Sequence, residues 1–191
     1  EMMTGVSETV LINDDVAVED SSYTTGRRGV AATVIVEKIV GSLAETGGSL
    51  KECKILGDKV NRNSGSMGVA FSSCTVPAAG KPTFKLGPYE MEFGVGIHGE
   101  PGRRRDKVQS AQEITNELLG AIIEDLKLEN NGEILLFVNG MGGTPLTELY
   151  LLYDNAKKTL DNKNIKIARS LVGNYCTSLE TVSYTHLTLP T

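Results

Sequence analysis

The residue best suited to chemistry is His98, in the stretch 92–102, which reads Glu-Phe-Gly-Val-Gly-Ile-His-Gly-Glu-Pro-Gly. Apolar residues alternate with glycines before it, a period typical of a strand that would end near His98. Glycines in a strand let a ligand or another backbone approach closely, and open α/β sheets bind ligands at strand ends. A neutral imidazole is a competent nucleophile near pH 7, since its unperturbed pKa is about 6.5. The pattern predicts a ligand site at His98; a hydrogen-bonded structural histidine is the alternative.

Asp14 and Asp15 form a second candidate, directly after the apolar run 9–12. Adjacent carboxylates could bind a metal or act as an acid/base pair. After a strand, however, they more often stabilise a turn or cap a helix. We therefore assign them no catalytic role.

The glycine-rich stretch 139–143 leads directly into Thr144 and Pro145, which suit the N-cap and the first position of a helix. Such a turn can hold an anion. It lacks the Gly-Lys-Ser/Thr of a Walker loop and is not a convincing dinucleotide fingerprint. A tight strand-to-helix turn is the favoured interpretation for Gly140 to Gly143, with a subunit contact or a wall of the substrate site as alternatives.

Two arginine clusters stand out, Arg27-Arg28 and Arg103-Arg104-Arg105. They are either solvated surface or a docking site for an acidic partner or phosphate.

The elements around these motifs predict an α/β fold, with a mixed sheet flanked by helices. Helices are expected where apolar residues recur at helical spacing, and one begins with the capping box Ser49–Glu52. The expected helices are 28–44, 49–60, 108–126 and 145–160, and the expected strands are 9–12, 67–71, 93–98, 133–139 and 165–172. The strand at 133–139 contains the continuous apolar run 134–138, as expected for a strand covered on both faces.

Composition describes one ordinary globular domain. The 191 residues carry a net charge of −5 and are 40% hydrophobic, which suggests no general attraction to nucleic acid. Neither a signal peptide nor a membrane span is recognisable. Three widely spaced cysteines, Cys53, Cys74 and Cys176, have no metal-ligand pattern and fit a reducing cytoplasm.

Several ordered motifs together resemble the substrate-binding subunit of dihydroxyacetone kinases. These motifs are residues 93–105 around His98, 23–31 (Tyr-Thr-Thr-Gly-Arg-Arg-Gly-Val-Ala), 67–70, 74–77, 138–145 and 177–180. The resemblance implies that residues 1–180 are the second α/β domain of that subunit, with the DAK1/DegV-like architecture and without the first domain. Residues 181–191 no longer resemble the family, and we expect them to be a non-native tail that contributes little to stability.

In such a family member, a ring nitrogen of His98 adds to the ketone of dihydroxyacetone to form a hemiaminal, so His98 is both the catalytic and the substrate-binding residue. Glu100 would orient the ring or only stabilise the turn. The resemblance places the acid/base residues in the first domain, and ATP or ADP with Mg²⁺ on a partner L subunit or domain, so this chain would bind no cofactor or metal. It also implies a homodimer and phosphoryl transfer to dihydroxyacetone, while the phosphoryl donor stays open.

The sequence leaves open two alternative functions of a different kind. One is a non-catalytic relative that binds dihydroxyacetone and contacts a transcription factor. The other is a free-standing small-molecule binding domain.

Overall fold

The computed structural model describes residues 5–18, 26–72, 80–81, 85–95 and 102–177, and the backbone of residues 183–190. Four helices and six strands lie in these ranges. In chain order they are α1 (Ala32–Glu45), α2 (Leu50–Arg62), β1 (Gly65–Ala70), β2 (Glu90–Phe93), β3 (Arg104–Lys107), α3 (Ala111–Leu126), β4 (Glu133–Met141), α4 (Leu146–Asn162), β5 (Lys166–Thr177) and β6 (Ser183–Pro190). None of the helices in the described part of the chain is long and apolar enough to cross a membrane.

The strands form one mixed sheet in the order β3-β2-β1-β6-β4-β5. Only β4 and β5 pair in parallel, and α4 connects them. The other neighbouring strands are antiparallel. The expected α/β fold with a mixed sheet flanked by helices is confirmed.

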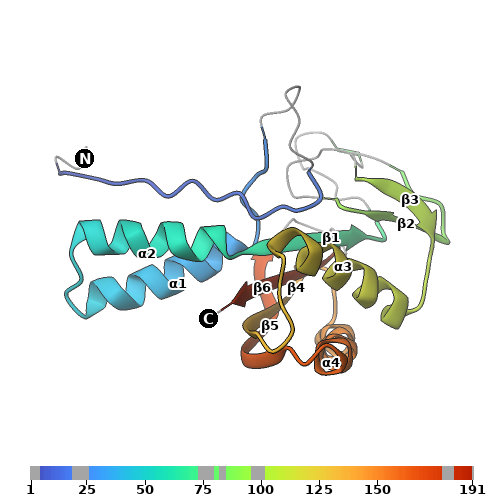
Figure 1. Ribbon diagram of the computed structural model, residues 1–191. Coiled ribbons are helices and arrows are strands. Elements are labelled where there is room, and N and C mark those ends of the chain that lie inside the picture. Colours follow the sequence, from blue (N-terminus) through green and yellow to red (C-terminus); the bar gives the residue numbers. More distant parts are fainter. Residues whose placement is uncertain are drawn as a thin grey trace.

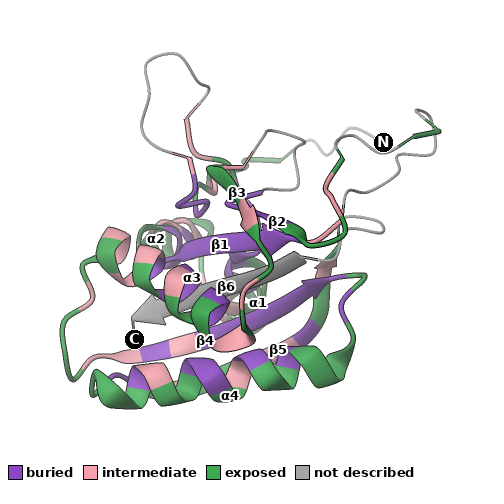
Figure 2. Cartoon of the chain, turned by 90° about the vertical axis from the view of Figure 1, so that its right-hand side faces the viewer, coloured by how far each residue is buried: buried purple, intermediate pink, exposed green. Residues whose placement is uncertain are grey.

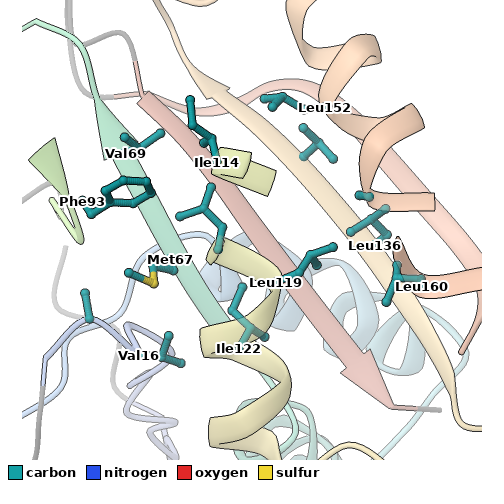
Figure 3. Packing of buried hydrophobic residues seen from close by; sticks show 14 of the residues in the cluster. Val16, Met67, Val69, Phe93, Ile114, Leu119, Ile122, Leu136, Leu152 and Leu160 are labelled. Atoms are coloured by element: carbon teal, nitrogen blue, oxygen red, sulfur yellow. The ribbon is translucent and has the colours of Figure 1, made fainter. Parts of the chain in front are cut away.

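Helices cover both faces of the sheet, and the apolar side chains of β4 point alternately into two hydrophobic clusters. Ile134, Leu136 and Val138 pack with α3 and α4 in the larger cluster, which Figure 3 shows against Val69, Phe93 and Leu119. Phe137 and Leu135 point the other way, into the cluster built on α1 and α2. The expectation that 133–139 is covered on both faces is therefore confirmed.

The helices α1 and α2 form a hairpin that projects beyond the sheet (Figure 1). Its α2 begins with the predicted capping box of Ser49 and Glu52. The predicted burial of α1 on most sides is wrong, since only Ala32, Ile35 and Val36 are buried within the helix. The helix also begins at Ala32, later than predicted, because the chain before it is held by Asp14.

The strand predicted over residues 9–12 is wrong, because these residues run along α2 without joining the sheet. The side chain of Asn61 donates to the carbonyl of Leu11 at 3.0 Å and accepts from the amide of Asn13 at 3.1 Å. Side-chain hydrogen bonds from a helix thus replace a strand ladder. The first contact with the sheet is the isolated bridge between Asp15 and Ser66.

The tail after residue 181 contributes β6, which lies between β1 and β4. Its backbone pairs with Gly65–Ala70 on one side and with residues 134–139 on the other. The expectation that the tail contributes little is contradicted by this central position, because removing it would leave two strands without a partner there. That the tail is non-native stays a prediction.

Candidate functional site

The segment that contains His98 leaves and rejoins the described structure at one end of β2. His98 and Glu100 lie outside the described residues, which stop at Val95 and resume at Gly102. The two flanks are tied together, because the amide of Arg103 donates to the carbonyl of Phe93 at 2.7 Å. We call residues 92–94 and 102–103 the loop base. The role of His98 stays a prediction, but the loop base limits where that segment can begin and end.

Gly94 ends β2 and forms one side of the loop base. Its amide donates to the carbonyl of Gly68 at 2.7 Å, and its φ of +75° is a left-handed conformation that favours glycine. A Cβ here would lie 2.9 Å from the Cβ of Ala17 and 3.1 Å from the Cγ of Arg103. The strand predicted to reach His98 therefore ends at Phe93, and this glycine permits the approach of protein rather than of ligand.

Glu92 and Gly102 form the other side of the loop base. Glu92 is 4% exposed, and its Oε1 accepts from the amide of Gly102 at 2.9 Å. Its Oε2 accepts from Nε of Arg105 at 3.1 Å. A Cβ on Gly102 would overlap the carbonyl oxygen of Phe93 and lie 2.8 Å from Cγ of Glu92. Only glycine fits at position 102 without a shift of these neighbours, because its backbone lies directly against β2.

The arginines at 103–105 are exposed, and each also contacts this chain. Arg103 donates to the carbonyl of Ala17 at 2.8 Å and to that of Val16. Arg104 pairs with Glu117 at 2.5 Å and lies over the ring of Phe93, 4.7 Å from its centroid. The hydrogen bond from Glu117 raises the pKa of Arg104, so this guanidinium is charged throughout the physiological range. The exposure of all three arginines fits the interpretation as solvated surface, and a docking site for an acidic partner or phosphate stays a prediction.

The arginine at 27 is also engaged internally. Its Nη1 donates to Oδ2 of Asp125 at 2.8 Å, and its Nη2 pairs with the other carboxylate oxygen. This pair joins the segment before α1 to the end of α3.

The side chain of Asp14 caps the N-terminus of α1, although the two are far apart in the sequence. Its buried carboxylate accepts from the amides of Val30 at 2.7 Å and Ala32 at 3.0 Å, where α1 begins and its dipole favours negative charge. Asp15 Oδ1 accepts from the amide of Ala17 at 3.0 Å, as in a turn. These contacts match the cap and turn interpretation. No cluster of three metal-ligating side chains lies in the described part of the chain.

The glycine-rich turn after β4 is closed by a side chain from β5. The amide of Gly142 donates to Oδ1 of Asn174 at 3.0 Å, and a Cβ on Gly140 would overlap the same oxygen. An amide that could bind an anion is therefore already used. The helix begins at Leu146 with Pro145 as its N-cap, one residue later than predicted.

An apolar groove in the described part of the chain lies apart from the loop base. This groove of about 500 Å³ lies between the N-terminal ends of α3 and α4 and is mainly apolar, with Phe71, Ile114 and Leu151 in its lining. None of its lining residues belongs to the loop base, so it adds nothing to the site expected at His98.

Sequence reasoning missed Glu92, Arg103 and Arg105 as parts of the site's support. Glu92 directly precedes the strand predicted over 93–98, and the sequence predicts no strand at the arginine cluster 103–105, where the structure has β3. The usable signal was the pair Glu92 and Arg105, since an acidic residue and a basic residue that flank a glycine-rich loop can pair across its base.

A family model described as the Dak1 domain matches residues 2–190. The PTS-dependent dihydroxyacetone kinase 1, dihydroxyacetone-binding subunit DhaK, of Listeria innocua is 47% identical over 91% of this chain. The chain spans about half the length of the curated relatives it matches, at 53%, 52% and 56% of three such proteins.

Solved structures of similar proteins share the fold. The dihydroxyacetone kinase operon co-activator Dha-DhaQ has a TM-score of 0.87 and 30% identity, over 95% of this chain and 56% of that one. The dihydroxyacetone kinase from C. freundii in complex with AMP-PNP and Mg²⁺ has a TM-score of 0.76 and 26% identity, over 95% of this chain and 33% of that one.

Proposed function

Because the chain belongs to the Dak1 domain family, we propose that it is part of a dihydroxyacetone (glycerone) kinase and binds dihydroxyacetone through His98. The observation that carries this proposal is its similarity, at 40–47% identity over most of its length, to four proteins named as dihydroxyacetone-binding subunits. The loop base supports it, because its hydrogen bonds hold both flanks of the His98 segment at one end of β2.

The chemistry proposed for His98 is reversible addition to the ketone. The unprotonated ring nitrogen forms a bond to the carbonyl carbon, and the carbonyl π electrons move to oxygen, which takes up a proton. The other ring nitrogen releases its proton, so the hemiaminal forms without net gain or loss. Glycerol has no carbonyl and is rejected. Covalent capture also orients a substrate too small to be oriented by contacts alone.

Phosphoryl transfer also needs a phosphoryl donor and acid/base residues, which we assign to other chains or domains. A partner L subunit or domain would hold ATP or ADP with Mg²⁺, and a preceding first domain would supply acid/base residues. The C. freundii kinase in complex with AMP-PNP and Mg²⁺ and the PTS-dependent relative from Listeria innocua represent two different donors. This chain's own residues would bind and orient the triose.

A cytoplasmic homodimer completes the proposal. Free thiols at Cys53 and Cys176 suit a reducing compartment. Exposed apolar side chains on the α1–α2 hairpin, with Leu50 at 43% and Ile55 at 58%, offer a surface for a second copy or a preceding domain.

A regulatory relative is the second candidate, favoured by the TM-score of 0.87 to the operon co-activator Dha-DhaQ. Such a protein would capture dihydroxyacetone without phosphorylating it. The sequence of a longer form distinguishes the two, since the kinase requires acid/base residues in the first domain.

The test is adduct formation on the intact chain. Incubation with dihydroxyacetone, trapping and mass spectrometry of the digest should place the added mass on the peptide with His98. Glycerol should give none. An adduct that persists unchanged in His98→Ala would overturn the assignment.

A further inference from the structure

Residues 6–12, which we call the N-terminal segment, have the side-chain pattern of a strand but not its main-chain hydrogen bonds. Exposure alternates along them, with Val10 and Ile12 partly buried and Leu11 82% exposed, which is the period of a strand. Within the described part of the chain, however, no amide of residues 6–12 donates a hydrogen bond. By contrast β1, which pairs on both sides, is buried along its whole length (Figure 2).

The inner face of the N-terminal segment is fixed on the α1–α2 hairpin. Val10 and Ile12 pack in the cluster built on α1 and α2. Gly57 of α2 makes room for Val10, because a Cβ there would lie 2.7 Å from Cγ2 of Val10. Gly29 does the same for Ile12, whose Cβ would lie 2.8 Å from a Cβ at position 29. Two glycines thus let the segment lie directly against the hairpin.

One edge of the N-terminal segment is closed by Asn61, and the other is open. The Nδ2 of Asn61 donates to the carbonyl of Leu11, and its Oδ1 accepts from the amide of Asn13. A residue of a neighbouring parallel strand would make the same two bonds with its main chain. Main-chain groups of alternate residues in a strand point to opposite edges, so those of Val10 and Ile12 point away from Asn61. That second edge can accept a strand.

The α1–α2 hairpin is uncovered over its distal half. The structure describes all of residues 37–56, and none of them is buried. This stretch contains six large apolar residues: Ile39, Val40, Leu43, Leu50, Ile55 and Leu56. Helices owe most of their stability to the packing of an apolar face. The hairpin projects beyond the sheet with the N-terminal segment beside α2 (Figure 1), so its distal half lacks a layer that would cover it.

We propose that the N-terminal segment is a strand of a second sheet, which a preceding domain supplies, and that the α1–α2 hairpin covers one face of that sheet. This inference rests on the preceding first domain of the proposed function. That domain is the partner because it would join the chain directly before the segment, and a short connection gives pairing a high effective concentration. The relatives are about twice as long as the part that this chain spans, which leaves room for a domain of similar size.

The experiment compares hydrogen exchange of the amides of residues 10–12 in this chain and in a longer form that includes the first domain. In this chain all three amides should exchange rapidly. In the longer form, those of Val10 and Ile12 should exchange at least about tenfold more slowly, the effect of one added hydrogen bond. The amide of Leu11, which points to the edge with Asn61, should be slowed less.

Leu11→Asp tests the outer face of the segment. Leu11 is exposed in this chain, so the substitution should change its Tm by no more than about 2 °C. In the longer form it should lower the Tm further and return the exchange of Val10 and Ile12 to within about threefold of the rates in this chain. Tyr150→Asp is the matched control, because Tyr150 is 57% exposed on α4 and should affect both forms equally.

Three outcomes would overturn the proposal. Equal exchange in the two forms would show that the segment gains no partner, and equal slowing of all three amides would show cover without strand pairing. Slow exchange in this chain that depends on its concentration would identify a second copy as the partner. A longer form that gives no adduct with dihydroxyacetone would instead overturn the proposed function, and the exchange rates would still decide whether the segment pairs.

Discussion

At the scale of residues, the region around His98 is organised by close contacts between main-chain segments. Gly94 and Gly102 stand where a side chain would collide with Ala17, Phe93 or Glu92. Arg103 reaches across the loop base to the carbonyls of residues 16 and 17. These contacts tie the two described flanks of the segment with His98 to each other and to residues 16 and 17.

Gly94→Ala should destabilise the chain by about 1–2 kcal/mol or more, because alanine resists a left-handed conformation and its Cβ would meet Ala17. Gly41→Ala is the control. Gly41 lies within α1 with open space around it, so alanine should stabilise the chain by up to about 1 kcal/mol. Urea unfolding of both variants measures the difference. Equal or greater stability of Gly94→Ala would show that the close approach at the loop base is not needed.

At the scale of elements, two helices begin with the same device. Ser49 with Glu52 starts α2, and Ser110 with Glu113 starts α3. In each, the side chain of the glutamate accepts hydrogen bonds from the serine, which lowers the pKa of Glu52 and of Glu113. Such a capping box sets where the helix begins.

The lowered pKa values predict how stability depends on pH. A carboxylate whose pKa is lower in the folded state stabilises that state at pH above its unfolded pKa, and this contribution is lost as the pH falls through the folded pKa. The stability lost below about pH 4.5 should therefore be smaller in the double variant Glu52→Gln/Glu113→Gln than in the unsubstituted chain. Unfolding curves at a series of pH values test this. Parallel losses in the two proteins would contradict it.

The elements also show what the sequence can predict. Periodicity identified all four helices and the strand at 133–139, because these elements bury continuous apolar faces. The capping box Ser110–Glu113 was available in the sequence and would have corrected the start of α3. The strand predicted at 9–12 failed because a polar contact with Asn61 on a distant helix replaced sheet pairing.

Other parts of the site could not be predicted, since they depend on pairing between distant strands. Only the register of β2 with β3 brings Arg105 beside Glu92. The same holds for Asn174, which reaches the turn at Gly142 from β5.

At the scale of the whole molecule, the chain combines a well-packed sheet with a projecting α1–α2 hairpin (Figure 1). Apolar side chains are exposed on that hairpin, and the chain spans about half the length of its curated relatives. Both observations support the proposal that this domain functions together with another domain or subunit. The proposed division is that this domain captures the substrate while other parts move protons and supply phosphate.

We therefore expect this chain to bind dihydroxyacetone but not to phosphorylate it, even with a nucleotide-binding partner and donor. General acid/base assistance is typically worth 10²- to 10⁴-fold, and the family resemblance places those residues in a preceding domain. The assay compares phosphate transfer by this chain with that of a longer form that includes the first domain. Equal turnover would show that the first domain is dispensable.

The most direct test of the central claim is whether a ring nitrogen of His98 bonds to the substrate carbonyl carbon. The chain has two histidines, His98 and His186, so ¹⁵N labelling of the imidazoles gives two rings to distinguish. With dihydroxyacetone labelled with ¹³C at the carbonyl, NMR should show a one-bond carbon–nitrogen coupling that His186→Ala retains and His98→Ala abolishes. Coupling that survives in His98→Ala, or bound substrate with an intact carbonyl in the unsubstituted chain, would contradict covalent capture by His98.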